Sequence, residues 1–172
     1  MKPLKCPLVS EDMERRFIAD SMLGRLARWL RLLGLDTLYY PDIEDGDLLR
    51  LTLREGRFLL TRDSHFMRMK NLKSLYLVRS NSPLEQLREV ITRCGITGYG
   101  EGRCARCNGI LQHVPEKGTV RDAVPEYVFL NCNSFFLCHS CGRVYWEGTH
   151  LKRFRSMIGN IVQQGAGDNA SG

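Results

Sequence analysis

The chain has 172 residues and a formal net charge of +6; 43% of its residues are hydrophobic and 26% are charged. This length and composition fit one medium-sized or two small globular domains and exclude a disordered chain. No apolar run approaches the ~20 residues of a membrane span, and the basic N-terminus lacks an apolar segment of signal-peptide length. We therefore expect a soluble cytoplasmic protein. The positive charge suits a nucleic-acid partner without indicating one.

The first ordered stretch is expected after a loose leader, residues 1–15. The apolar run Phe17–Ala19 predicts a buried strand that ends at the carboxylate of Asp20. Leucines spaced by three and four residues then predict a helix with a core-facing stripe, and Gly34 follows as its C-terminal cap. An acid at the exit of a strand, with a helix behind it, is where α/β folds place their chemistry.

Strands and helices alternate through the next sixty residues. Three more strands are predicted at residues 37–40, 58–61 and 75–78, with helices at residues 48–55 and 83–93, the second opened by a capping box at Ser82 to Glu85. This order predicts an α/β fold with a mostly parallel sheet and helices on both faces. Right-handed crossovers would then bring the carboxyl ends of the strands to one edge.

Several acids are expected at that edge. Asp20 and Asp63 follow strands, and one or more of Asp42, Asp45 and Asp47 could join them from the acidic stretch between. Carboxylates close together repel unless cations neutralise them, and oxygen ligands of this kind suit Mg²⁺ or Mn²⁺. The alternative is that Asp20 and Asp47 only cap helices while Asp63 caps a turn. His65, two residues after Asp63, is either a ligand, a proton carrier or a surface residue.

Three arginines, at positions 25, 28 and 31, lie along one side of the first predicted helix. A solvated helix face explains them, but their proximity to Asp20 also allows contacts to phosphate groups.

The second half of the chain has a different pattern. The Gly-rich residues 96–102 are expected to link a domain at residues 16–95 to another at residues 103–157, and residues 158–172 to form a flexible tail. Short β-like pieces are predicted at residues 109–114, 127–130 and 143–146.

This second domain contains two C-x-x-C pairs, Cys104/Cys107 and Cys138/Cys141. Seven cysteines in all, an odd number, together with the paired spacing favour metal over disulfides. Four thiolates would complete a closed tetrahedral zinc site, and a small domain with few aliphatic residues needs such a cross-link. Redox chemistry is the rival interpretation. Cys132 could compete as a ligand, although a buried thiol is the simpler role for it.

Four segments together resemble the Mut-seven C-terminal RNase family: residues 18–36 (IADSMLGRLARWLRLLGLD), 59–63 (LLTRD), 103–109 (RCARCNG) and 141–150 (CGRVYWEGTH). The resemblance spans about residues 16–155. It implies a PIN-like nuclease domain followed by a zinc ribbon, RNA as substrate, and metal-binding acids at Asp20, Asp47 and Asp63. Many PIN-like nucleases have another acid just past the third, where this chain has Ser64-His65.

We therefore predict a metal-dependent ribonuclease with Mg²⁺ or Mn²⁺ at Asp20, Asp47 and Asp63 and a structural zinc ion at the four cysteines. RNA contacts are expected from Arg25, Arg28, Arg31 and Arg62, and in the ribbon from Arg143, Tyr145, Trp146, Lys152, Arg153 and Arg155. Two alternatives stay open: an RNA-binding module without turnover, and a zinc-containing protein–protein adaptor whose acids are helix caps.

Overall fold

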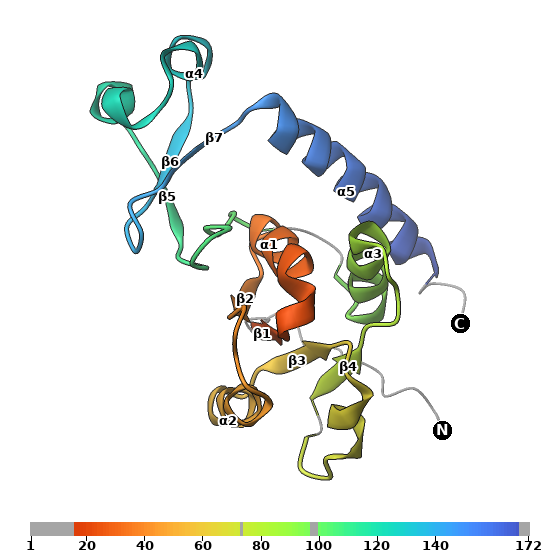
Figure 1. Ribbon diagram of the computed structural model, residues 1–172. Helices are drawn as coiled ribbons and strands as arrows, with labels where there is room; N and C mark the ends of the chain where they lie inside the picture. The colour runs from red at the N-terminus through yellow and green to blue at the C-terminus, as the bar shows by residue number, and fades with distance from the viewer. Residues whose placement is uncertain (1–15, 73, 97–99, 169–172) are drawn as a thin grey trace.

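A parallel four-stranded sheet forms the first part of the molecule, with the strand order β2-β1-β3-β4 (Figure 1). The computed structural model describes residues 16–168 apart from 73 and 97–99, so the predicted leader lies outside the described residues. The strands are β1 (Arg16–Ala19), β2 (Asp36–Tyr39), β3 (Phe58–Thr61) and β4 (Leu75–Leu77). The parallel pairing confirms the α/β prediction and brings the carboxyl ends of all four strands to one edge.

Helices cover both faces of this sheet. On one face, α1 (Gly24–Leu32) and α3 (Pro83–Arg93) enclose the larger apolar cluster, which includes Leu26, Leu30 and Leu60. On the other face, α2 (Asp45–Glu55) and the 3₁₀ helix η2 (Ser64–Arg68) enclose a smaller cluster around Ile18, Leu59 and Phe66. Successive residues of each buried strand therefore contribute to opposite clusters, as the two-residue strand period requires.

The predicted helix ends are mostly confirmed. Gly34 and Gly56 follow α1 and α2 with φ of +86° and +61°, the left-handed conformation that glycine adopts at low cost. A Cβ at position 34 would lie 2.7 Å from the carbonyl oxygen of Glu101, so the glycine also admits the returning chain. The prediction of a capping box at α3 was wrong in one respect. Ser82 is the N-cap and Pro83 is the first residue of the helix, but the Ser82 side chain makes no capping hydrogen bond.

The second part, residues 103–148 (the ribbon), is built on an antiparallel sheet. Its strands are β5 (Leu111–His113), β6 (Phe135–Cys138) and β7 (Val144–Trp146), in that order. Between β5 and β6 stand the 3₁₀ helix η3 (Lys117–Ala123) and α4 (Glu126–Asn131). The prediction of a β piece at residues 127–130 was therefore wrong. There α4 packs its Phe129 ring beneath Lys117 and Arg121, whose charged groups lie 4.8 and 5.3 Å from the ring centre.

The chain leaves the ribbon as a long helix, α5 (Thr149–Asp168), which returns to the first part and lies against α3 (Figure 1). Ile158 and Ile161 are buried in the larger apolar cluster, and the Phe154 ring lies 5.8 Å from that of Trp29. The flexible tail predicted from residue 158 was thus wrong for residues 158–168. Across the described residues, no helix is long and apolar enough to cross a membrane.

Candidate metal centres and nucleic-acid surfaces

The four predicted metal ligands meet at one end of the ribbon. Their sulfur atoms all lie within 4.8 Å of one another, with 3.5 Å between Cys104 and Cys141 and 3.4 Å between Cys107 and Cys138. A tetrahedral zinc ion with Zn–S bonds of about 2.3 Å needs sulfur atoms about 3.8 Å apart. A Cβ at Gly109 would lie 2.9 Å from the Cys138 sulfur, so this glycine lets the backbone fold around the cluster. The donor set and its spacing fit Zn²⁺.

The electrostatics of the cluster favour a bound cation. Burial raises the pKa of Cys104, but hydrogen bonds from the Tyr145 hydroxyl and nearby backbone N–H groups lower it to about 6. Burial and the neighbouring sulfur atoms raise the pKa of Cys107 to about 12. Once one thiol has lost its proton, its negative charge makes ionisation of the neighbouring thiol less favourable. A divalent cation removes this conflict because it stabilises all four thiolates together.

Arg31 attaches the first C-x-x-C pair to the sheet domain. Its guanidinium is buried and donates to the backbone oxygens of Thr37 (2.8 Å), Ala105 (3.0 Å) and Arg106 (3.0 Å). Burial lowers the pKa of Arg31, while the charges of Cys104 and Cys107 raise it. The prediction that Arg31 contacts RNA was therefore wrong: its positive charge lies inside the molecule, beside the sulfur cluster.

A second buried link joins the same two parts through Asn108 and Asp36. Asn108 accepts a hydrogen bond from the backbone N–H of Thr37 (3.0 Å) and donates one to Asp36 (2.7 Å). Asp36 also pairs with Arg57 at 2.7 Å, and Arg57 itself is 4% exposed. Burial raises the pKa of Asp36, but hydrogen bonds from Arg57 and Asn108 outweigh it and lower the pKa below its usual value.

Sequence reasoning singled out none of Asp36, Arg57 and Asn108. One signal was available for Arg31: it follows Ala27 by four residues, so it borders the core-facing stripe of the helix. The other three come from distant parts of the chain, and no local pattern connects them.

At the carboxyl edge of the parallel sheet, Asp20 is buried and fully engaged. One carboxylate oxygen accepts from the backbone N–H of Met22 (2.9 Å); the other accepts from the Thr61 hydroxyl (2.6 Å) and the N–H of Arg62 (2.7 Å). Asp20 is thus the N-cap of the 3₁₀ helix η1 (Ser21–Leu23), the capping role that the sequence left open.

Asp63 lies next to this site and is exposed. Its N–H donates to the Thr61 hydroxyl (2.9 Å), the same hydroxyl that donates to Asp20. One oxygen of its carboxylate accepts from the N–H of His65, which makes Asp63 the N-cap of η2. The His65 ring is exposed and lies edge-on to Phe66. Asp20 and Asp63 are therefore connected through one threonine.

Asp47, the third predicted acid, is exposed in the first turn of α2 and pairs with Arg50. With Tyr40 and Asp42 it lines an open hollow of about 610 Å³ beyond the end of β2. Among the described residues, only the four cysteines form a group of three or more Cys, His, Asp or Glu side chains close enough to share an ion. The structure therefore does not bring Asp20, Asp47 and Asp63 together around one ion position.

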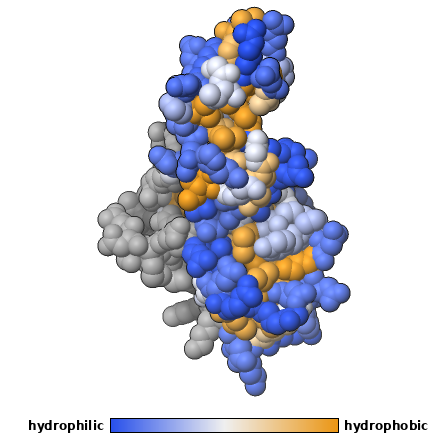
Figure 2. Space-filling model, turned by 90° about the vertical axis from the view of Figure 1, so that its left-hand side faces the viewer, coloured by the Kyte–Doolittle hydropathy of each residue, from blue (hydrophilic) through white to orange (hydrophobic). Residues whose placement is uncertain are grey.

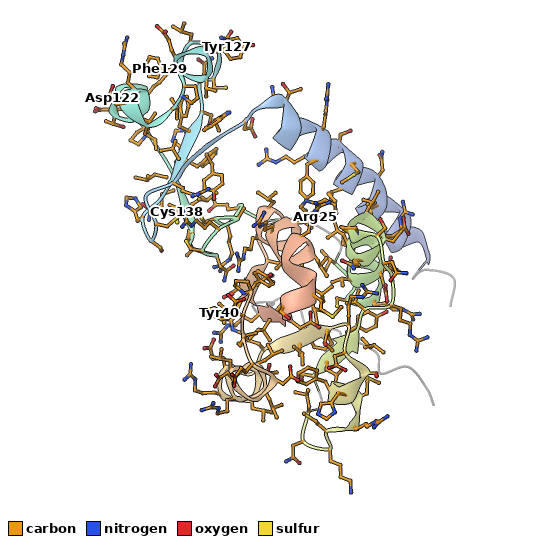
Figure 3. The ribbon with its side chains drawn as sticks, in the orientation of Figure 1. Arg25, Tyr40, Asp122, Tyr127, Phe129 and Cys138 are labelled. Carbon is orange, nitrogen blue, oxygen red and sulfur yellow. The ribbon has the colours of Figure 1, made fainter. Side chains whose placement is uncertain are left out.

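The remaining predicted RNA contacts are mostly at the surface. Arg25, Arg28, Arg143, Lys152, Arg153 and Arg155 are exposed, Tyr145 and Trp146 are half-buried, and the half-buried Arg62 donates to Asn81. Figure 2 shows a mainly hydrophilic face with separate apolar patches over both parts of the molecule. Figure 3 places Cys138 at the end of the ribbon near the sheet domain, with Tyr127 and Phe129 at the far end.

The chain was compared with family models, curated proteins and solved structures. No curated protein and no solved structure matches the chain. The family model described as the Mut7-C RNAse domain matches residues 15–158, which include the acidic edge, the four cysteines and the buried links between them. The chain therefore belongs to the Mut7-C RNAse domain family.

Proposed function

We propose that the protein is a metal-dependent ribonuclease, with a PIN-like catalytic domain at residues 16–95 and a ribbon that holds a structural zinc ion and assists RNA binding. The family supports an RNase activity. The observation that carries the proposal is that the Thr61 hydroxyl links the Asp20 carboxylate to the backbone N–H of Asp63, so that both acids lie at the carboxyl edge of the sheet. Chemistry in open parallel sheets is concentrated at that edge.

Asp20, Asp47 and Asp63 are the candidate ligands for Mg²⁺ or Mn²⁺. Three carboxylates would make a suitable donor set and two of them are exposed, but the structure does not hold the three around one ion position. To take part, Asp47 would exchange its pairing with Arg50 for the ion. When bound, a divalent ion polarises a phosphodiester and activates water.

The chain's own residues would orient these groups. The Thr61 hydroxyl and the Arg62 N–H hold the Asp20 carboxylate in one position, while Asp63 presents its carboxylate to solvent. Exposed cations of α1 and α5 would attract the RNA backbone: Arg25, Arg28, Lys152 and Arg153.

A second candidate is an RNA-binding module without turnover. The observation in its favour is that Asp20 already accepts three hydrogen bonds and Asp47 is paired with Arg50. In this case Asp20 and Asp63 serve as helix caps, and the basic surface alone determines the function. The alternative prediction that Asp47 also caps a helix was wrong, because Glu44 is the N-cap of α2.

The decisive experiment compares the wild type with Asp63→Asn on labelled RNA in the presence of Mn²⁺. Asparagine keeps the Oδ1 atom that accepts from His65 and caps helices as well as aspartate does, so folding is preserved. We expect cleavage by the wild type and a loss greater than the ~10–100-fold that removing an outer-shell partner causes. Asp122→Asn, at an exposed acid of the ribbon, is the matched control and should cleave normally.

The outcomes separate the candidates. RNA binding without cleavage by the wild type supports the binding module. Absence of RNA affinity at low salt rejects both functions. Zinc is tested separately, because metal analysis that finds well under one zinc per chain would overturn the structural zinc site.

A further inference from the structure

One face of the ribbon sheet carries a row of ring side chains. His113, Phe136 and Tyr145 stand directly opposite one another on β5, β6 and β7. Residues paired in this way point to the same side of a sheet. The His113 and Phe136 rings meet edge to face, with centres 5.6 Å apart. His113 is exposed, and the other two rings are half-buried.

This row forms one wall of a hollow between the ribbon and the rest of the molecule. The hollow has a volume of about 520 Å³, within the ~300–1,000 Å³ that small-molecule sites occupy. Its other walls include Leu32 of α1, the backbone of Gly100 and Gly102, and Arg155 of α5. Both parts of the protein therefore contribute to one site. Its lining contains none of the four cysteines and none of the acids of the sheet edge, although the Tyr145 hydroxyl also lies 3.0 Å from the Cys104 sulfur.

The chemistry of the walls suits a planar heterocycle. Aromatic rings and a guanidinium plane are the surfaces on which nucleobases stack. Arg155 is paired with Glu147, which holds its guanidinium in place. Glu101 and Gln112 also line the hollow and can hydrogen-bond to the edge of a base.

The charges favour a base inside the hollow and phosphates outside it. The Glu101 carboxylate repels a phosphate but can accept from the amino and imino groups of a base. The exposed Lys152 and Arg153 lie on the same helix as Arg155 and offer positive charge to the backbone of a bound strand.

We propose that this hollow, formed by His113, Phe136, Tyr145 and Arg155, binds an unpaired base of single-stranded RNA by stacking. A base within a duplex is already stacked and paired, so only a single strand, loop or bulge can supply one. The inference rests on the proposed function in one respect, that RNA is the ligand. It adds that the hollow selects unpaired RNA, whether or not the acidic edge cleaves it.

The test measures binding without added Mg²⁺ or Mn²⁺, so that cleavage plays no part. The probes are a fluorescent ten-nucleotide single strand, the same sequence as a duplex, and the same strand with abasic positions at its centre. The variants are His113→Ala, at an exposed position, and Phe136→Leu, which keeps an apolar side chain but removes the ring. Tyr127→Ala, which removes a ring 76% exposed elsewhere on the ribbon, is the matched control.

We expect the wild type to bind the intact single strand about tenfold more tightly than the duplex or the abasic strand, because one stacked base is lost. Each hollow variant should lose about the same factor on the intact strand and nothing on the abasic strand. Tyr127→Ala should bind like the wild type. Equal binding of intact and abasic strands, or hollow variants that bind normally, would overturn the inference.

The two proposals fail separately. Base-dependent binding by a protein that never cleaves RNA rejects the nuclease and supports the base site. Cleavage by the wild type, together with normal binding by His113→Ala and Phe136→Leu, rejects the base site and supports the nuclease.

Discussion

The parallel-sheet domain and the ribbon are stabilised in different ways. The sheet domain has two apolar clusters, and Leu26, Leu30, Leu59 and Leu60 are fully buried within them. The cluster of the ribbon has only three buried members, Val120, Val124 and Phe135. Burial of apolar surface can account for the first domain, whereas the second has too small a core and needs a cross-link. We therefore expect the ribbon, but not the sheet domain, to depend on a metal ion bound at the four cysteines.

Polar groups form the boundary between the two parts. Arg31, Asp36 and Asn108 connect the first C-x-x-C pair to β2 by buried hydrogen bonds. Such groups stabilise only when all partners are present, because a partner left alone in the interior keeps its desolvation cost. A substitution on either side of the boundary should therefore lower the stability of both parts.

The largest effect is expected from loss of the metal. Cys138→Ser, at a fully buried ligand position, should abolish zinc binding and remove on the order of 10 kcal/mol that the metal contributes to the ribbon. Hydrogen exchange should show loss of protection in β5 and β7, while Leu59 and Leu60 in the sheet domain remain protected. Cys132→Ser, outside the cluster, is the matched control and should bind zinc normally. An equal loss of protection in both parts would contradict the claim that only the ribbon depends on the metal.

Asp36→Asn is expected to cause a smaller loss of stability, which involves both parts of the molecule. The change removes the charge of one of the two carboxylates that pair with the buried Arg57 and leaves Glu55, at 2.8 Å, as the other. Leaving a buried charge without any partner costs about 3–5 kcal/mol, so with Glu55 still in place we expect a loss of about 1–3 kcal/mol. Urea unfolding should measure this loss in the free energy of unfolding, with Asp122→Asn as the exposed control. A cost below about 1 kcal/mol, as for a surface pair, would show that the boundary is not a buried network.

The smallest effect is the dependence of that same contribution on pH. The folded-state pKa of Asp36 is lowered because hydrogen bonds from Arg57 and Asn108 outweigh its burial. Its contribution is therefore present above the unfolded-state pKa near 4 and is lost as the pH falls through the lower folded value. The difference in unfolding free energy between the wild type and Asp36→Asn should shrink below about pH 4. A difference that grows on acidification would have the wrong sign.

The sequence predicted the parts of the fold that depend on local pattern. Leucines three and four residues apart located α1, glycines located the ends of α1 and α2, and the C-x-x-C spacing located the cysteine cluster. The helix α4 was missed because Tyr127–Leu130 has strong β propensity. Its conformation depends instead on tertiary contacts, including the cations above Phe129.

The sequence could not decide the candidate site in the same way. Asp20 and Asp63 were correctly placed at the ends of strands, but a capping acid and a metal-binding acid have the same local pattern. The burial of Arg31 was not predicted. Two of the groups that accept its hydrogen bonds, the carbonyls of Ala105 and Arg106, lie more than seventy residues away in the sequence. The place of Arg31 beside the apolar stripe of the helix hints at burial, but a single sequence does not show which distant groups it pairs with.

The position of the first C-x-x-C pair has a consequence for association between molecules. β2 is an edge strand, and an exposed edge offers backbone groups on which another chain can add a strand. At Thr37 both groups are occupied, because Asn108 accepts from the N–H and Arg31 donates to the carbonyl. Asn108 directly follows Cys107 and donates its N–H to the Cys104 carbonyl (2.9 Å), so a zinc ion bound at the cluster would also protect this edge. A protein that loses its zinc should therefore become prone to aggregation through β2 while its apolar core is still folded.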